Sequence, residues 1–295
     1  LQTDISMTAQ DIVVSSPPPL ARKPTTKALQ GTTDTHFHIF ESTETYPLSP
    51  TRMYDPALST VDDYRAMAQT VGIDRMVVVQ ASIYGTDNRC LVDSIERLGV
   101  KNTRGIAVVD QSITLNALRD MDRRGVRGIR FNAITGRTPI EWLPALAKMI
   151  EPLGWHIQLW TNSARLLEIG HILNDVPLPI VLDHMGQFPA AEGVQGNQFQ
   201  NILRLMKDDR FWIKLVGYRV SKAPPAFEDI RETAKVLVSV APERCLWGTD
   251  WPHIYLEGRP MPNTTELFET VDSWLSPAEA GRVFVQNPAR LYGFG

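Results

Sequence analysis

Short apolar segments alternate with longer segments of helical periodicity along most of this 295-residue chain, and this alternation constrains the fold most strongly. The apolar segments are nearly continuous in Val, Ile and Leu, as expected for parallel strands covered on both faces. We predict strands over residues 32–38, 75–82, 104–109, 126–132, 156–161, 180–184, 211–216 and 245–250. We predict helices over residues 61–71, 90–98, 113–124, 142–153, 164–174, 199–207, 227–240 and 265–274.

Eight successive β-then-α units favour a closed (β/α)8 barrel, the TIM barrel, over an open doubly wound sheet. A dinucleotide-binding open sheet would carry G-x-G-x-x-G after its first strand, and no such motif follows that strand here. We therefore predict a single α/β catalytic domain, a (β/α)8 barrel over residues 31–295. A proline-rich N-terminal arm over residues 1–30 is predicted to be extended or disordered.

The composition excludes several classes of function. The formal net charge is −3 and neither sign forms a long run, so we expect no nucleic-acid partner and no polybasic membrane patch. No apolar run approaches the roughly 20 residues that span a bilayer, so we expect a cytoplasmic protein without a membrane partner. Cys90 and Cys245 are far apart and lack metal-type spacing, which fits a reducing compartment. No feature of the sequence specifies an oligomer.

Two histidines, His36 and His38, lie at the end of the first predicted strand. Because alternate side chains of a strand point the same way, both imidazoles face one side. Such a pair suits a metal ion or a site that stabilises developing negative charge. A lone H-x-H is more simply explained by one buried histidine and one turn histidine, so the remaining strand ends must decide.

In a (β/α)8 barrel the carboxyl ends of all strands share one mouth. His184 ends the sixth predicted strand and Asp250 ends the eighth. Burying three imidazoles and a carboxylate is costly unless they satisfy one another or a ligand. We therefore predict one catalytic cluster of His36, His38, His184 and Asp250, with Arg130 nearby. The other polar residues at the strand ends are predicted to bind substrate: Ser82, Tyr84, Asn132, Trp160, Lys214, Tyr218 and His253.

Several segments together resemble the amidohydrolase superfamily, specifically the branch of 2-pyrone-4,6-dicarboxylate lactonase and D-galactarolactone isomerase. They are residues 34–38 (DTHFH), 79–82 (VQAS), 128–130 (GIR), 182–186 (LDHMG), 212–214 (WIK), 248–253 (GTDWPH) and 287–292 (NPARLY). H-x-H alone is a weak match, whereas GTDWPH is a strong one. The resemblance implies an amidohydrolase-like barrel and chemistry on a lactone.

One departure from the superfamily bears on metal binding. Metal-dependent members place a histidine or a carboxylated lysine at the ends of strands four and five, where this chain has Arg130 or Asn132, and Trp160. The resemblance to the lactonase and lactone isomerase branch implies a site that works without a metal. We therefore expect no cofactor. The alternative is a zinc ion bound by the four residues of the predicted catalytic cluster.

Opening a lactone requires a nucleophile and a group that stabilises the charge on the carbonyl oxygen. The N–H groups of the three cluster histidines, with Arg130, are candidate donors, and one such donor is typically worth about 3 kcal/mol. Asp250 is the candidate general base. The ordinary aspartate pKa of about 3.9 is low for this role, and cationic neighbours would lower it further unless burial opposes them.

The group that Asp250 deprotonates determines the reaction. Deprotonation of water gives a lactone hydrolase, whereas deprotonation of a substrate hydroxyl moves the acyl group and turns a six-membered lactone into a five-membered one. A pyrone dicarboxylate would require several arginines. Besides Arg130, the loop arginines Arg52, Arg89 and Arg219 are more simply explained as solvated surface charges.

We therefore predict a metal-independent isomerase of a sugar-acid lactone, closest to D-galactarolactone isomerase, whose partner is a small lactone bearing a carboxylate. The first alternative is a lactone hydrolase such as 2-pyrone-4,6-dicarboxylate lactonase. The second is a zinc-dependent amidohydrolase or decarboxylase.

Overall fold

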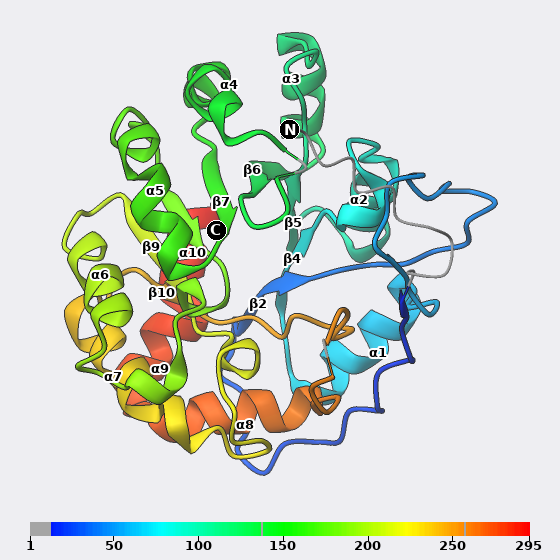
Figure 1. The fold of residues 1–295 in the computed structure, drawn as a ribbon. Helices are drawn as coiled ribbons and strands as arrows, with labels where there is room; N and C mark the ends of the chain where they lie inside the picture. The colour runs from blue at the N-terminus through cyan, green and yellow to red at the C-terminus, as the bar shows by residue number, and fades with distance from the viewer. Residues whose placement is uncertain (1–12, 137, 257) are drawn as a thin grey trace.

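Eight parallel strands form a ring at the centre of the molecule in the computed structural model (Figure 1), which describes residues 13–136, 138–256 and 258–295. Their hydrogen-bonded order is β2-β4-β5-β6-β7-β8-β9-β10, the order of the chain. The strands are β2 (Thr33–Phe37), β4 (Arg75–Val79), β5 (Thr103–Ala107), β6 (Val126–Asn132), β7 (His156–Trp160), β8 (Ile180–Leu182), β9 (Phe211–Lys214) and β10 (Cys245–Leu246).

Backbone hydrogen bonds between the first strand and the segment after the last one close the ring. The amide of Thr35 donates to the carbonyl oxygen of Trp247 at 3.0 Å, and the amide of Asp250 donates to that of His36 at 2.7 Å. This closure confirms the predicted (β/α)8 barrel and excludes the open sheet. It also brings β2 and the segment that carries Asp250 side by side.

Helices surround the ring, and each predicted helix is present (Figure 1). Helix α1 shows how the sequence sets their ends: Thr60 and Asp63 form a capping box at its start, and Gly72 ends it in the left-handed region at φ 94°. The helices are α1 (Val61–Val71), α2 (Arg89–Leu98), α3 (Leu115–Arg123), α4 (Leu143–Ile150), α5 (Ser163–Asn174), α6 (Asn197–Leu205), α7 (Arg231–Val240), α8 (Thr264–Trp274), α9 (Pro277–Gly281) and α10 (Asn287–Tyr292).

Alternating side chains along the strands divide the apolar residues into two cores. The larger core lies between the strands and the surrounding helices and includes Val78 and Ile129. The smaller core contains Val77 and Val79, the neighbours of Val78 that point to the opposite face of β4. Tyr292, at the end of α10, belongs to this inner core. The barrel interior is therefore a packed core beneath the mouth rather than a channel.

The described part of the N-terminal arm, residues 13–30, is extended and passes along α8 and α1 (Figure 1). Its strand β1 (Val13–Val14) pairs with β3 (Tyr54–Asp55), and Arg22 forms an ion pair with Glu269 of α8. The remaining predicted arm residues, 1–12, lie outside the described residues.

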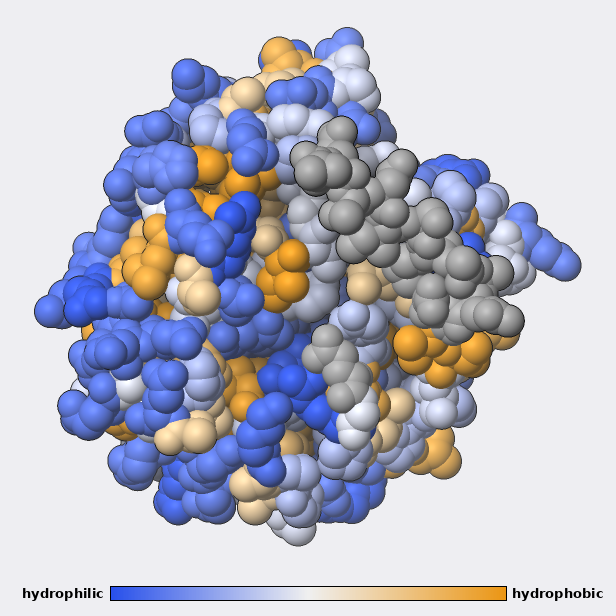
Figure 2. Space-filling model, viewed as in Figure 1, coloured by the Kyte–Doolittle hydropathy of each residue, from blue (hydrophilic) through white to orange (hydrophobic). Residues whose placement is uncertain are grey.

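The face of the molecule shown in Figure 2 is mainly hydrophilic, and its apolar residues lie in separate patches. Among the residues that the structure describes, no helix combines the length and the hydropathy needed to cross a membrane.

Candidate active site

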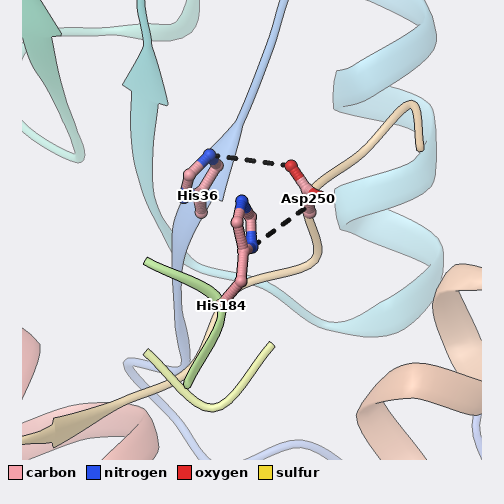
Figure 3. Close-up of side chains that lie close together, drawn as sticks. All are labelled: His36, His184 and Asp250. Atoms are coloured by element: carbon pink, nitrogen blue, oxygen red, sulfur yellow. Dashed lines mark ion pairs between the residues drawn. The ribbon is translucent and has the colours of Figure 1, made fainter. Parts of the chain in front are cut away.

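The four residues of the predicted catalytic cluster meet at the mouth of the barrel. His36 lies in β2 and His38 just beyond it, and the Nε2 atoms of both lie 3.6 Å from Oδ1 of Asp250. His184, which follows β8, lies beside His36, with its Nδ1 3.9 Å from Oδ2 of Asp250 (Figure 3). All four side chains are nearly or fully buried.

Three atoms in this cluster are buried without a hydrogen-bond partner among the described residues. They are Nε2 of His36, Nδ1 of His184 and Oδ1 of Asp250. Each of these three residues also offers one possible ligand atom within 4.8 Å of those of the other two. Unsatisfied buried polar atoms are costly, and several of them facing one point indicate a place for a ligand atom.

The ring orientations show which histidine nitrogens carry hydrogen. Nδ1 of His38 lies 2.8 Å from the carbonyl oxygen of Val79, so Nδ1 is the donor, and in this tautomer Nε2 is an acceptor. Nδ1 of His36 lies 3.2 Å from a carboxylate oxygen of Asp183, which favours the same tautomer. The predicted role of His38 as an N–H donor to a developing oxyanion does not fit this arrangement, because its donor is already used.

Two side chains of the loop after β9 hold the other oxygen of Asp250. Its Oδ2 accepts hydrogen bonds from the Tyr218 hydroxyl at 2.6 Å and from Nε of Arg219 at 2.5 Å. Burial alone would raise the pKa of Asp250, but Arg219 and the neighbouring histidine rings together outweigh burial and hold that pKa well below its usual value. Asp250 is therefore an ionised carboxylate and a weak base.

Burial has the opposite consequence for the imidazoles, because it disfavours their charged form. It lowers the pKa of His184 to about 3, and it lowers the pKa of His36 well below its usual value. Both rings are therefore neutral at physiological pH.

A second buried carboxylate, Asp183, lies directly beneath the cluster. Its Oδ2 accepts hydrogen bonds from Nε and Nη2 of Arg130 at 3.1 and 3.0 Å, and from Gln158 at 3.2 Å. Lys214 donates to Gln158 at 2.8 Å, and its Nζ lies 3.8 Å from Oδ1 of Asp183. Although burial opposes ionisation, Arg130 and Lys214 hold the pKa of Asp183 well below its usual value. This network orients His36 and Arg130 from below.

A cavity opens above the cluster, and most of the predicted site residues line it. Those residues are His38, Ser82, Arg130, Asn132, Trp160, His184 and Asp250. Arg219, which the sequence analysis considered only as a surface charge, also lines the cavity. The remaining lining residues were not predicted: Met53, Tyr54, Thr135, Ile254 and Tyr255.

Four predicted substrate-binding residues lie outside this lining. Lys214 is fully buried below the cluster, and Tyr218 contacts Asp250 from behind. The Tyr84 hydroxyl accepts a hydrogen bond from the amide of Glu41, and Nε2 of His253 lies 2.9 Å from the Thr264 hydroxyl. These four side chains support the site or neighbouring loops rather than face the cavity.

The loop arginines also separate into two groups. Arg52 and Arg89 form ion pairs with Asp55 and Asp87 outside the cavity, as expected for surface charges. Arg219 was given the same interpretation, but its side chain is only 8% exposed and it forms an ion pair with Asp250. A second arginine, besides Arg130, therefore lines the cavity.

The cluster is a candidate zinc site, because histidine nitrogens and a carboxylate oxygen are among the ligands that zinc prefers. The free atoms of His36, His184 and Asp250 supply such a donor set. The surrounding charges do not suit a dication: Arg219 already pairs with Asp250, and Arg130 and Lys214 share Asp183, so the three cations outnumber the two carboxylates before any metal binds. We therefore find that the donor atoms fit zinc whereas the charge of the site does not.

The fold and this site are those of an amidohydrolase. The amidohydrolase family model matches residues 33–294, so the chain belongs to that family.

Three relatives belong to the branch that the sequence motifs indicated. The 4-sulfomuconolactone hydrolase of Hydrogenophaga intermedia is 34% identical over 272 residues, 89% of each chain. The 2-pyrone-4,6-dicarboxylate hydrolase of Comamonas testosteroni is 34% identical over 284 residues, 92% of each chain. The D-galactarolactone isomerase of Agrobacterium fabrum is 27% identical over 270 residues, 89% of this chain and 91% of that protein. These matches confirm the predicted resemblance.

A solved structure agrees with these matches. The crystal structure of a probable 2-pyrone-4,6-dicarboxylic acid hydrolase from Acinetobacter baumannii, with citric acid bound, superposes with a TM-score of 0.76 at 25% identity. The match covers 90% of this chain and 100% of that one.

Proposed function

We propose that this protein hydrolyses a lactone that carries at least one carboxylate, without a metal. The observation that supports this most directly is the convergence of Nε2 of His36 and His38 on Oδ1 of Asp250, at 3.6 Å from each. These atoms accept hydrogen bonds, and a water molecule can donate two. A water held by both of its hydrogens keeps a lone pair for attack on a carbonyl carbon.

In the proposed reaction the water oxygen attacks the lactone carbonyl and Asp250 accepts a proton from the water. The ring C–O bond then breaks, the leaving oxygen takes up a proton, and the product carries one new carboxyl group. Because Arg219 lowers the basicity of Asp250, much of the rate acceleration must come from stabilising the negative charge on the carbonyl oxygen. Arg130, which lines the cavity, is the charged donor proposed for this role.

The charges around the cavity support an anionic substrate. Arg130 and Arg219 line the cavity and Lys214 lies beneath it, so three cations stand against the two carboxylates that they contact, Asp183 and Asp250. The isomerase prediction assumed that Arg130 is the only arginine of the site, and Arg219 removes that premise. The citric acid bound to the Acinetobacter baumannii structure, and the hydrolase names of the two relatives at 34% identity, support a carboxylate-bearing lactone and hydrolysis.

Two cavity-lining donors would select such an oxygen-rich substrate. The Tyr54 hydroxyl and Nε1 of Trp160 are buried without a hydrogen-bond partner among the described residues. Because the indole N–H can only donate, Trp160 requires an acceptor, and a substrate carbonyl or carboxylate oxygen supplies one.

The hydroxyl of Tyr218 is expected to contribute measurably to turnover. In Tyr218→Phe, Asp250 loses one of the hydrogen bonds that fix the direction of its carboxylate, so we expect kcat to fall about tenfold through misplacement of the base. The matched control is Tyr46→Phe, which removes a tyrosine hydrogen bond to Asp93 outside the site. Steady-state kinetics of both variants measures this effect. Equal kcat values for the two variants would contradict a contribution of the Tyr218 hydroxyl to catalysis through Asp250.

The experiment that tests the proposed function is a pH-stat assay of chelator-treated enzyme with 2-pyrone-4,6-dicarboxylate and with D-galactarolactone. We expect one equivalent of acid for each equivalent of substrate lost, at a rate unchanged by chelation. Substrate loss without acid release would instead favour the isomerisation catalysed by the relative at 27% identity. Activity that disappears on chelation and returns with zinc would overturn the proposal of metal independence.

A further inference from the structure

A third buried aspartate, Asp34 of β2, lies outside the cavity lining and is fully enclosed. Its Oδ1 accepts hydrogen bonds from the amides of His36 at 3.0 Å and Thr249 at 2.9 Å. Its Oδ2 accepts from the Thr249 hydroxyl at 2.6 Å and from the Tyr64 hydroxyl at 3.0 Å. Burial raises the pKa of Asp34 to about 6, so the carboxylate is ionised at pH 7.5 and can accept all four.

These hydrogen bonds join the two segments that carry the cluster. Asp34 contacts the backbone of His36 on one side and Thr249 on the other, and Thr249 immediately precedes Asp250. The Thr249 hydroxyl oxygen also accepts a hydrogen bond from the amide of Trp251 at 3.0 Å. Asp250 therefore lies between Thr249, which donates its amide and hydroxyl hydrogens to Asp34, and Trp251, whose amide donates to the Thr249 hydroxyl oxygen.

The backbone of Asp250 requires such support. Its φ is +55°, in the left-handed region that residues with a side chain seldom occupy. The preceding Gly248 permits the close approach of the two segments, because a Cβ there would lie 2.8 Å from the backbone nitrogen of His36. Without a bond on each side, the segment could relax and carry the carboxylate of Asp250 away from the imidazoles.

We infer that Asp34 and Thr249 are positioning residues, whose mutual hydrogen bonds fix the carboxylate of Asp250 against His36 and His38. This inference rests on the proposed function, because it makes Asp34 and Thr249 responsible for the placement of the acceptor atoms that bind the attacking water. Neither side chain lines the cavity, so they act on turnover through Asp250 rather than through substrate.

The test is Thr249→Val, which keeps the shape of the side chain and removes its hydroxyl. At pH 7.5 we expect kcat to fall about tenfold to a hundredfold, with KM within about threefold of wild type, because misplacing a catalytic group by about 1 Å costs about that much. Thr249→Ser, which restores the hydroxyl, is expected to recover most of kcat. The matched control is Thr233→Val, since Thr233 is also buried and its hydroxyl donates to the carbonyl oxygen of Ile230 rather than to a residue of the site.

Equal kcat values for Thr249→Val and Thr233→Val would overturn the inference, as would a Thr249→Ser variant no better than Thr249→Val. If Thr249→Val does not fold, Tyr64→Phe removes another hydrogen bond to Asp34 and is expected to lower kcat about threefold to tenfold. An unchanged kcat in Tyr64→Phe would then overturn it.

A crystal structure provides a readout that does not depend on the substrate. In Thr249→Val we expect Oδ1 of Asp250 to lie farther from Nε2 of His36 than the wild-type 3.6 Å. An unchanged distance would overturn the inference even if the enzyme acts on another substrate. Absence of lactone turnover by the wild-type enzyme would instead overturn the proposed function alone.

Discussion

The Asp250→Asn variant is expected to lose at least about a hundredfold in kcat while keeping its fold. The amide keeps the size of the carboxylate and can still accept hydrogen bonds from Tyr218 and Arg219 through its oxygen. It cannot take a proton from water at neutral pH, and loss of a general base typically costs 10²–10⁴-fold. Steady-state kinetics and thermal unfolding of the same preparation measure both quantities.

The control for this variant is Asp208→Asn. Asp208 precedes β9 at the opposite end of the barrel and forms an ion pair with Arg210, so its loss removes a charge without touching the cluster. We expect the wild-type kcat for Asp208→Asn. Retention of most of the activity by Asp250→Asn would remove Asp250 from the proposed role of base.

Lys214→Met is expected to cause the largest loss of stability, about 3–5 kcal/mol in the free energy of unfolding. Removing Lys214 takes one cation from the fully buried Asp183, which keeps Arg130, and it removes the buried hydrogen bonds that Lys214 donates to Thr35 and Gln158. Chemical denaturation measures this loss. In the exposed control Lys148→Met we expect a change within about 0.5 kcal/mol. A Lys214→Met variant as stable as this control would contradict the claim that the contacts of Lys214 beneath the cluster stabilise the fold.

The difference in stability between the wild type and Lys214→Met is also expected to depend on pH. Burial lowers the pKa of Lys214 to about 8, below its ordinary value of 10.5. Between these two values the unfolded chain binds the proton more than the folded one, so the contribution of Lys214 to stability should rise as the pH increases from 8 to about 10. The stability difference between wild type and Lys214→Met is therefore expected to widen over this range. A difference that narrows would mean that folding favours the charged amine.

The sequence predicted the fold well because barrel strands and helices have strong and distinct periodicities. Helix α1 (Val61–Val71) begins and ends where the apolar spacing and the capping residues indicated. The last strand is shorter than predicted, because pairing in β10 ends at Leu246 and the chain then turns into the left-handed conformation at Asp250. Trp247 extends the apolar run by one residue past the end of that strand, so composition alone did not mark the end.

The cluster could be predicted because each of its residues lies at or just beyond a strand end, and all strand ends of a barrel meet at one mouth. Lys214 shows the limit of that argument. It ends β9 yet points into the barrel beneath the mouth, because a strand end does not fix the depth of a side chain. Asp183 was not assigned a role because its partners, Arg130 and Gln158, lie on other strands.

Arg219 was misjudged for a related reason. Most loop arginines are solvent-exposed, and no local pattern separates Arg219 from Arg52 or Arg89. Its partner, Asp250, is 31 residues away on another loop, so only the three-dimensional structure shows the ion pair. One local signal was available, because Tyr218, already a predicted site residue, directly precedes it in the sequence.

A lactone-opening reaction run in water enriched in ¹⁸O examines the origin of the new carboxyl oxygen. With wild-type enzyme, one ¹⁸O atom is expected in each product molecule by mass spectrometry, and Asp250→Asn should form such product at least about a hundredfold more slowly. Complete conversion by the wild-type enzyme into an unlabelled product would contradict the claim that these side chains hold and activate a water molecule.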